Sequence, residues 1–196
     1  MTPLRRLLAR LRGAVAAPPP RRVLYVHEDD MGDVELLPEA ARAWCAEELR
    51  RIDAFAAAHE APDGLGWTDI HVRPPAPARL GDLGLRAAAA AARLRRVAPA
   101  YDGVETGTYS DVEVAAGATA FGADGSGALV LHVDAAGALT GVDVVPQGGA
   151  GLGPLLDAVR DLAAPSRLVA VAWNRGALAA LDDPGERAAF IRAIAG

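Results

Sequence analysis

Residues 23–38 read VLYVHEDDMGDVELLP, the stretch with the densest cluster of ionisable side chains in the chain. An apolar run enters it, five acids and a histidine follow, and a second apolar run leaves it. Two apolar runs joined by a short polar segment are typical of two strands connected by a tight turn. The pattern therefore predicts a β-hairpin with an acidic turn.

The segments after the hairpin predict a helix and then a strand. Pro38 suits the first turn of a helix, and apolar residues recur at helical spacing from Ala41 to His59. Residues 66–73 then alternate strictly, as a strand does. Thr68, Ile70 and Val72 are expected on one face of that strand. The opposite face would carry Trp67, Asp69, His71 and Arg73.

The remaining elements give the fold class. We expect a helix over 82–97, antiparallel strands over 101–145, a helix from 154 and a buried strand over 167–173. A last helix would start after Asp183 in a capping box with Glu186. This order predicts an α+β fold, with a mixed, mostly antiparallel sheet and helices packed on one face. The expected large core residues are Trp44, Phe55, Trp67, Phe121, Trp173 and Phe190.

The length of 196 residues fits one domain. Residues 1–20 end in three prolines at 18–20, which favour an extended break. We therefore expect a flexible basic N-terminal arm over residues 1–20 and a single α+β domain over residues 21–196.

The charge is distributed unevenly along the chain. All 20 basic residues are Arg, and six of them lie in the first 22 residues, which contain no acid. Since the whole chain carries −5, residues 23–196 carry −11. An acidic body repels phosphate backbones, so we expect no nucleic-acid binding and favour a basic protein partner. The Arg, Ala, Gly and Pro usage is typical of a GC-rich bacterial genome.

Cys45 is the only cysteine, which excludes an intrachain disulfide and a Cys-based zinc site and favours the reducing cytoplasm. It falls on the apolar stripe of the first helix, so we interpret it as a core residue. No apolar run approaches the roughly 18 residues of a membrane span. We expect a cytoplasmic location, no membrane span and no cofactor.

The acidic turn is the first candidate site. It could form a polar rim for a partner, a solvated turn, or a set of metal-binding or catalytic carboxylates. The spacing does not match a calcium loop or a helical zinc motif, so no metal site is expected. We favour the rim, and its proposed binding residues are His27, Glu28, Asp29 and Asp30.

The second candidate is the face with Trp67, Asp69, His71 and Arg73. Trp and Arg are common anchors of protein interfaces. Asp69 and His71 could also orient each other for acid–base chemistry, but no nucleophile motif accompanies them. An ordinary strand face with a hydrogen-bonded His71 is the third interpretation.

Two loops complete the set of candidates. Asn174 and Arg175 follow the buried strand, and loops at strand ends commonly hold binding residues. The glycine-rich segment 148–153 lacks the spacing of a phosphate-binding loop, so we interpret it as a flexible connection.

These patterns favour a non-catalytic, acidic protein-binding module over an enzyme. Immunity proteins, which neutralise toxins by masking basic active sites, are one bacterial class of this kind, and the analogy is one of class only. The alternative is a metal-assisted or acid–base hydrolase that uses His27, Glu28, Asp30, Asp69 and His71.

Overall fold

The computed structural model describes residues 21–108 and 111–195. The strands are β1 (Val23–His27), β2 (Val34–Pro38), β3 (Gly103–Thr108), β4 (Asp111–Val114), β5 (Ala118–Ala123), β6 (Gly127–Val133), β7 (Leu139–Val145), β8 (Leu168–Ala172) and β9 (Ala177–Ala180). The α-helices are α2 (Arg42–His59), α3 (Ala87–Leu94), α4 (Leu152–Ala163) and α5 (Pro184–Ala195). Short 3-10 turns are η1 (Glu28–Asp30), η2 (Glu39–Ala41), η3 (Leu80–Leu83) and η4 (Trp173–Arg175). The predicted α+β class is confirmed.

Two sheets organise the described part of the chain. The large sheet has six strands in the order β5-β6-β7-β2-β8-β9, and its pairs are antiparallel. The small sheet has the order β1-β3-β4, with β1 parallel to β3. All five residues of β8 are buried because both of its faces are covered, which explains its continuous apolar run.

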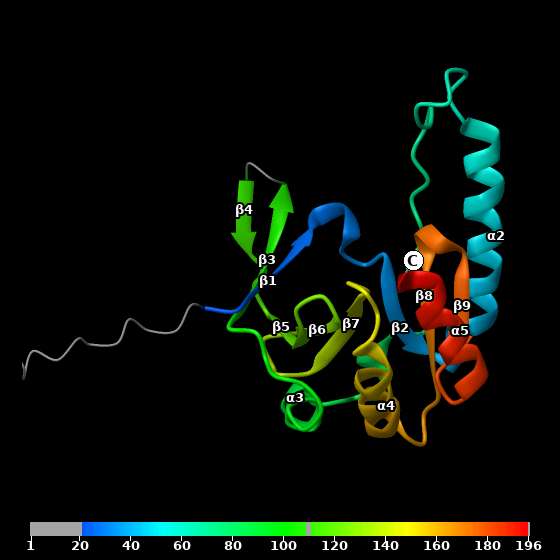
Figure 1. Cartoon of the computed structure of the whole chain (residues 1–196). Coiled ribbons are helices and arrows are strands. Elements are labelled where there is room, and N and C mark those ends of the chain that lie inside the picture. Colours follow the sequence, from blue (N-terminus) through cyan, green and yellow to red (C-terminus); the bar gives the residue numbers. More distant parts are fainter. Residues whose placement is uncertain (1–20, 109–110, 196) are drawn as a thin grey trace, which may run out of the picture.

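Helices α3, α4 and α5 cover one face of the large sheet, and α2 and the small sheet cover the other (Figure 1). Alternate residues of β8 show this: Ala170 packs with α3, α4 and α5, whereas Val169 and Val171 pack with α2. The small sheet covers the β5–β7 half of the α2 face through Leu24 and Val26. The expectation of helices on one face therefore holds for α3, α4 and α5, while α2 lies on the other.

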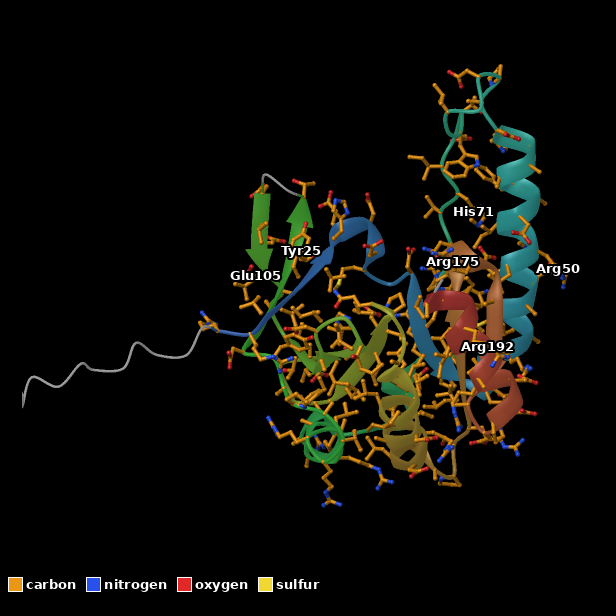
Figure 2. All side chains as sticks on the ribbon, in the orientation of Figure 1. Tyr25, Arg50, His71, Glu105, Arg175 and Arg192 are labelled. Atoms are coloured by element: carbon orange, nitrogen blue, oxygen red, sulfur yellow. The ribbon has the colours of Figure 1, made fainter. Side chains whose placement is uncertain are left out.

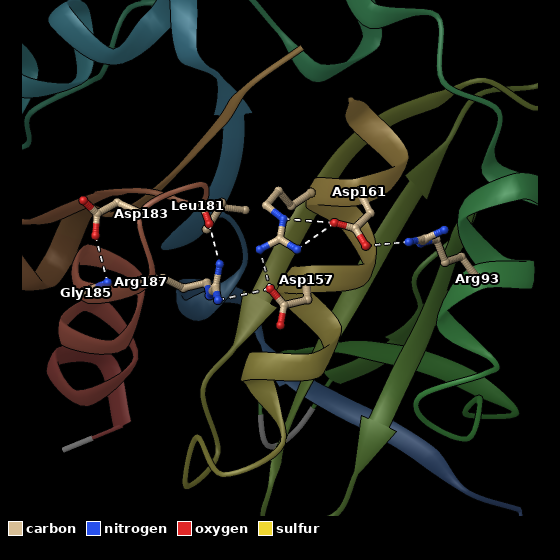
Figure 3. Close-up of polar contacts among 8 residues, drawn as sticks. Arg93, Asp157, Asp161, Leu181, Asp183, Gly185 and Arg187 are labelled. Carbon is tan, nitrogen blue, oxygen red and sulfur yellow. Dashed lines mark hydrogen bonds and ion pairs between the residues drawn. The ribbon is translucent and has the colours of Figure 1, made fainter. Parts of the chain in front are cut away.

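Ion pairs join the three helices that share a face (Figure 3). Asp161 of α4 accepts from Arg93 of α3 at 2.6 Å, and Asp157 of α4 lies 3.2 Å from Arg187 of α5. The cap of α5 forms as expected, with Asp183 Oδ1 accepting from the backbone N–H groups of Gly185 and Glu186. The Glu186 carboxylate does not complete the capping box by binding back to the Asp183 backbone; it accepts from the Ala180 backbone N–H and from Arg42.

The predicted hairpin of residues 23–38 is wrong. Val23 pairs with Gly103 in the small sheet, and Val34 pairs with Ala172 in the large one. The physical reason is burial. Most of β2 is covered from both sides, so it takes a central position, whereas β1 alternates buried and half-buried residues and suits an edge. The acidic turn therefore connects two sheets.

The predicted strand over residues 66–73 is also wrong. Only Trp67 forms a bridge, with Glu60, the chain bends at residues 68 and 69, and residues 68–73 belong to no strand. Trp67 is exposed and does not belong to the core, whereas Phe121, Trp173 and Phe190 are buried. The helix expected over 82–97 is divided into η3 and α3, and β9 is a strand that the sequence patterns did not indicate.

The predicted basic arm of residues 1–20 lies outside the described residues. In the part of the chain that the structure covers, no helix combines the length and the apolarity needed to cross a membrane.

Candidate functional site

A cleft of about 380 Å³ opens where the two sheets meet. Four segments far apart in the sequence form it: β1 with the acidic turn, the end of β7, η4 and the end of α5. Figure 2 shows Tyr25 on the small sheet and Arg175 on the turn after β8, which contribute to different walls. Its polar lining residues are Tyr25, His27, Asp30, Asp33, Gln147, Asn174 and Arg175. We call this site the acidic cleft.

The acidic turn forms one wall of the acidic cleft. His27 caps η1, since its Nδ1 accepts from the backbone N–H of Asp29 at 3.3 Å. The backbone N–H of Met31 donates to the Glu28 carbonyl and ends the turn. Glu28, Asp29 and Asp30 are all exposed, so their charges lie at the rim and not in a core.

Asp33 joins the acidic turn to the opposite wall. Its Oδ2 accepts from Asn174 Nδ2 at 2.6 Å, and its backbone carbonyl accepts from Trp173 N at 2.8 Å. Burial raises the pKa of Asp33, and the negative charges of Asp30 and Asp29 raise it further, while Arg73 acts in the opposite direction. The wall therefore concentrates negative charge that the protein only partly compensates.

A second polar cluster lies on the sheet face between the small sheet and α2. Glu35 Oε1 accepts from the Trp173 indole at 2.7 Å and from Arg73 at 3.0 Å. The Arg73 guanidinium also lies 4.2 Å from the centre of the Trp173 ring, a cation–π contact. On the neighbouring strand, Asp143 stands opposite Glu35 and pairs with His132 at 2.7 Å.

The segment from residue 60 to 79 returns beside α2 and is held at two points (Figure 1). His71 Nε2 lies 2.7 Å from Oε1 of the fully buried Glu48 of α2. Two residues on, Arg73 contacts Glu35 of β2. The Arg73–Glu35 contact is an ion pair and the His71–Glu48 contact is a short side-chain hydrogen bond, and both hold the segment against the body of the protein.

Between and before these anchors, four large apolar side chains face solvent. They are 67% to 87% exposed, and we call them the apolar ledge: Leu65, Trp67, Ile70 and Val72. Sequence alternation predicted Ile70 and Val72 on a face opposite His71 and Arg73. The structure keeps that alternation, but it is the charged set that points inward.

The structure separates the predicted site residues into two places. His27, Asp30, Asn174 and Arg175 line the acidic cleft, with Glu28 and Asp29 beside it on η1. Trp67 and Asp69 are exposed on the returning segment, whereas His71 and Arg73 anchor it. Asp33, which also lines the cleft, belonged to the acidic stretch singled out from the sequence but was not among the proposed binding residues. Tyr25 and Gln147 carried no sequence signal.

Two further predictions concern Cys45 and the glycine-rich segment. Cys45 is fully buried, which confirms it as a core residue, and burial raises the pKa of its thiol to about 11. In the glycine-rich segment, Gly148 has a left-handed φ of +77°, and a Cβ there would lie 2.4 Å from the Gly125 carbonyl oxygen. That glycine is required by close packing of two loops.

Within residues 21–108 and 111–195, no group of three or more His, Cys, Asp or Glu side chains is arranged to hold a metal ion. No protein-family model, no curated protein and no solved structure matches the chain. The acidic cleft and the apolar ledge are therefore interpreted from their own chemistry.

Proposed function

We propose that this protein is a non-catalytic binding module that docks a basic protein partner on the apolar ledge. The observation that carries the proposal is the inverted alternation of residues 70–73. An extended segment on a protein surface ordinarily turns its apolar residues inward and its polar residues to water. Here Ile70 and Val72 face water while His71 and Arg73 bind buried or half-buried acids.

Exposed apolar residues gathered on one segment are typical of protein-interaction sites. Trp67 is the natural anchor, because Trp is enriched among the residues that dominate interface energies. The His71–Glu48 and Arg73–Glu35 contacts hold the backbone extended before a partner arrives. A surface that is already ordered loses less conformational entropy on binding, which supports a docking role.

The charge of the ledge supports a basic partner. Residues 60–72 contain Glu60, Asp63 and Asp69 and no arginine. All three acids are exposed on the same stretch of chain as the ledge, and surface charge of one sign steers an oppositely charged partner. A toxin whose basic active site is covered by its neutralising protein is one partner with this chemistry.

The experiment compares three forms of the full chain as bait in a bacterial lysate. They are the wild type, a ledge variant (Trp67→Ala, Ile70→Ser, Val72→Ser) and a matched control in which the exposed Val112 and Val114 of β4 become Ser. We expect one stoichiometric basic protein with the wild type and the control, and its loss with the ledge variant. Binding should weaken as salt is raised. Identical recovery by wild type and ledge variant would contradict the proposal.

The hydrolase alternative gains no support from this arrangement. It requires His27, Glu28 and Asp30 to act with Asp69 and His71. The first three lie at the acidic cleft or beside it, whereas His71 is bonded to Glu48 on α2.

A further inference from the structure

We propose that the acidic cleft binds a small aliphatic zwitterion, of which a free branched-chain amino acid is the simplest form. This inference goes beyond the docking function, because the cleft and the apolar ledge are built from different segments. It rests on the size of the cleft, on opposite charges at its walls and on its apolar lining.

The size of the cleft restricts the ligand. Small-molecule sites span roughly 300–1,000 Å³, and about 380 Å³ lies near the lower end. Four chain segments contribute to its lining, and strand ends position most of them. A ligand held there would contact both sheets and the end of α5, so its binding energy would be distributed over independent, rigid elements.

The acid wall favours an ammonium group. Asp30 and Asp33 both line the cleft, and the negative charge of Asp30 makes ionisation of Asp33 less favourable. The Asn174 amide fixes one oxygen of Asp33 by its bond to Oδ2. A ligand cation placed between the two carboxylates would relieve their repulsion, and this favourable energy arises only when the ligand is bound.

The opposite wall supplies a cation for a carboxylate. Arg175 lines the cleft and is exposed, and among the described residues no carboxylate lies within ion-pairing distance of it. A guanidinium presents a planar fork of donors that matches a carboxylate in two parallel hydrogen bonds. The Gln147 side-chain amide, just after the end of β7, also lines the cleft and adds a neutral polar group.

The apolar lining favours a branched aliphatic body between the two charges. Its buried members are Val26, Val34, Val144, Val145 and Ile194. These side chains offer dispersion contacts to a methyl-rich group and no hydrogen bonds. A purely cationic ligand would leave Arg175 unmatched, and a purely anionic one would meet Asp30 and Asp33, so the zwitterion alone satisfies both walls.

The test uses three matched probes with the full chain in isothermal titration calorimetry. L-leucine carries both charges, 3-methylbutylamine lacks the carboxylate, and 4-methylpentanoate lacks the amine. We expect leucine to bind at least about tenfold more tightly than either single-charge probe, a difference that the loss of one charge-assisted pair produces. The side-chain amide signals of Asn174 and Gln147 should shift in NMR spectra on addition of leucine.

Two substitutions assign the walls. Arg175→Gln should weaken leucine about tenfold and leave 3-methylbutylamine unchanged, whereas Asp30→Asn should weaken both. Arg192→Gln, at an exposed arginine outside the cleft lining, is the matched control and should change neither affinity.

No heat and no amide shift with leucine, valine or isoleucine up to about 10 mM would overturn the proposal. Equal affinity for all three probes, or an unchanged leucine affinity in Arg175→Gln, would overturn it too. None of these outcomes depends on the ledge.

Discussion

The imidazole Nε2 of His71 lies 2.7 Å from Oε1 of Glu48, a carboxylate with no exposed surface. This contact holds the ledge segment against α2. Removing His71 would leave Glu48 buried with only the more distant Arg51, at 3.6 Å, as a charged neighbour. Because a buried carboxylate that loses its close partner is strongly destabilising, we expect His71→Ala to lower the free energy of unfolding by about 3 kcal/mol, measured by urea denaturation.

A double-mutant cycle separates the His71–Glu48 contact from simple loss of packing. Glu48→Gln removes the carboxylate that His71 contacts, so the same His71→Ala change should be less harmful in that background. Strict additivity of the two substitutions would show that the pair is not coupled. If His71→Ala alone lowers the free energy of unfolding by less than about 0.5 kcal/mol, the His71–Glu48 contact does not hold the segment.

The raised pKa of Asp33 gives a second prediction. Folding disfavours its ionised form, so stability is lost as the pH rises from the ordinary value of 3.8 through the raised pKa. Asp33→Asn removes this loss and keeps an acceptor for Asn174. The variant should therefore melt higher than the wild type at pH 7, by a few degrees at most, and equal it below about pH 4. A lower melting temperature at pH 7 would contradict the assignment.

His132 gives a pH dependence of the opposite kind. Its hydrogen bond with Asp143 raises the pKa of the imidazole, and burial only partly offsets that effect. The pairing therefore contributes its full stability below the ordinary pKa of about 6.5, and this contribution is lost as the pH rises through the raised pKa. The stability difference between wild type and His132→Gln should shrink over that window in urea denaturation. An NMR titration of His132 below 6.5 would contradict it.

Local pattern was sufficient where partners are close in sequence. The alternation around residues 128–145 predicted the β6–β7 hairpin, which forms with Leu131 opposite Val142. Local pattern failed for residues 23–38, because the two strands on either side of a turn can still join different sheets. The partner of Val23 is Gly103, which lies far along the chain, and no local signal distinguishes that parallel pairing from a hairpin.

The candidate site shows the same limit. His27, Asp30, Asn174 and Arg175 could be nominated because polar residues at strand ends commonly form sites, and the structure brings these four to one cleft. Alternation separated Ile70 and Val72 from His71 and Arg73 correctly, but it grouped the exposed Trp67 with the latter pair, and it cannot say which set faces inward. That choice depends on Glu48 and Glu35, acids on other elements that attract His71 and Arg73.

Cys45 offers a direct measure of how tightly α2 packs on the sheet. Its thiol has no exposed surface, and its pKa of about 11 leaves roughly one molecule in a thousand as the reactive thiolate at pH 8. We therefore expect almost no reaction of the native protein with a disulfide reagent, and full reaction of one thiol per chain in urea. His71→Ala should accelerate the native reaction if loosening of the returning segment also loosens α2. Rapid modification of the folded wild type would show that α2 leaves the sheet readily, and the packing of Cys45 against Val171 would then not be the stable arrangement.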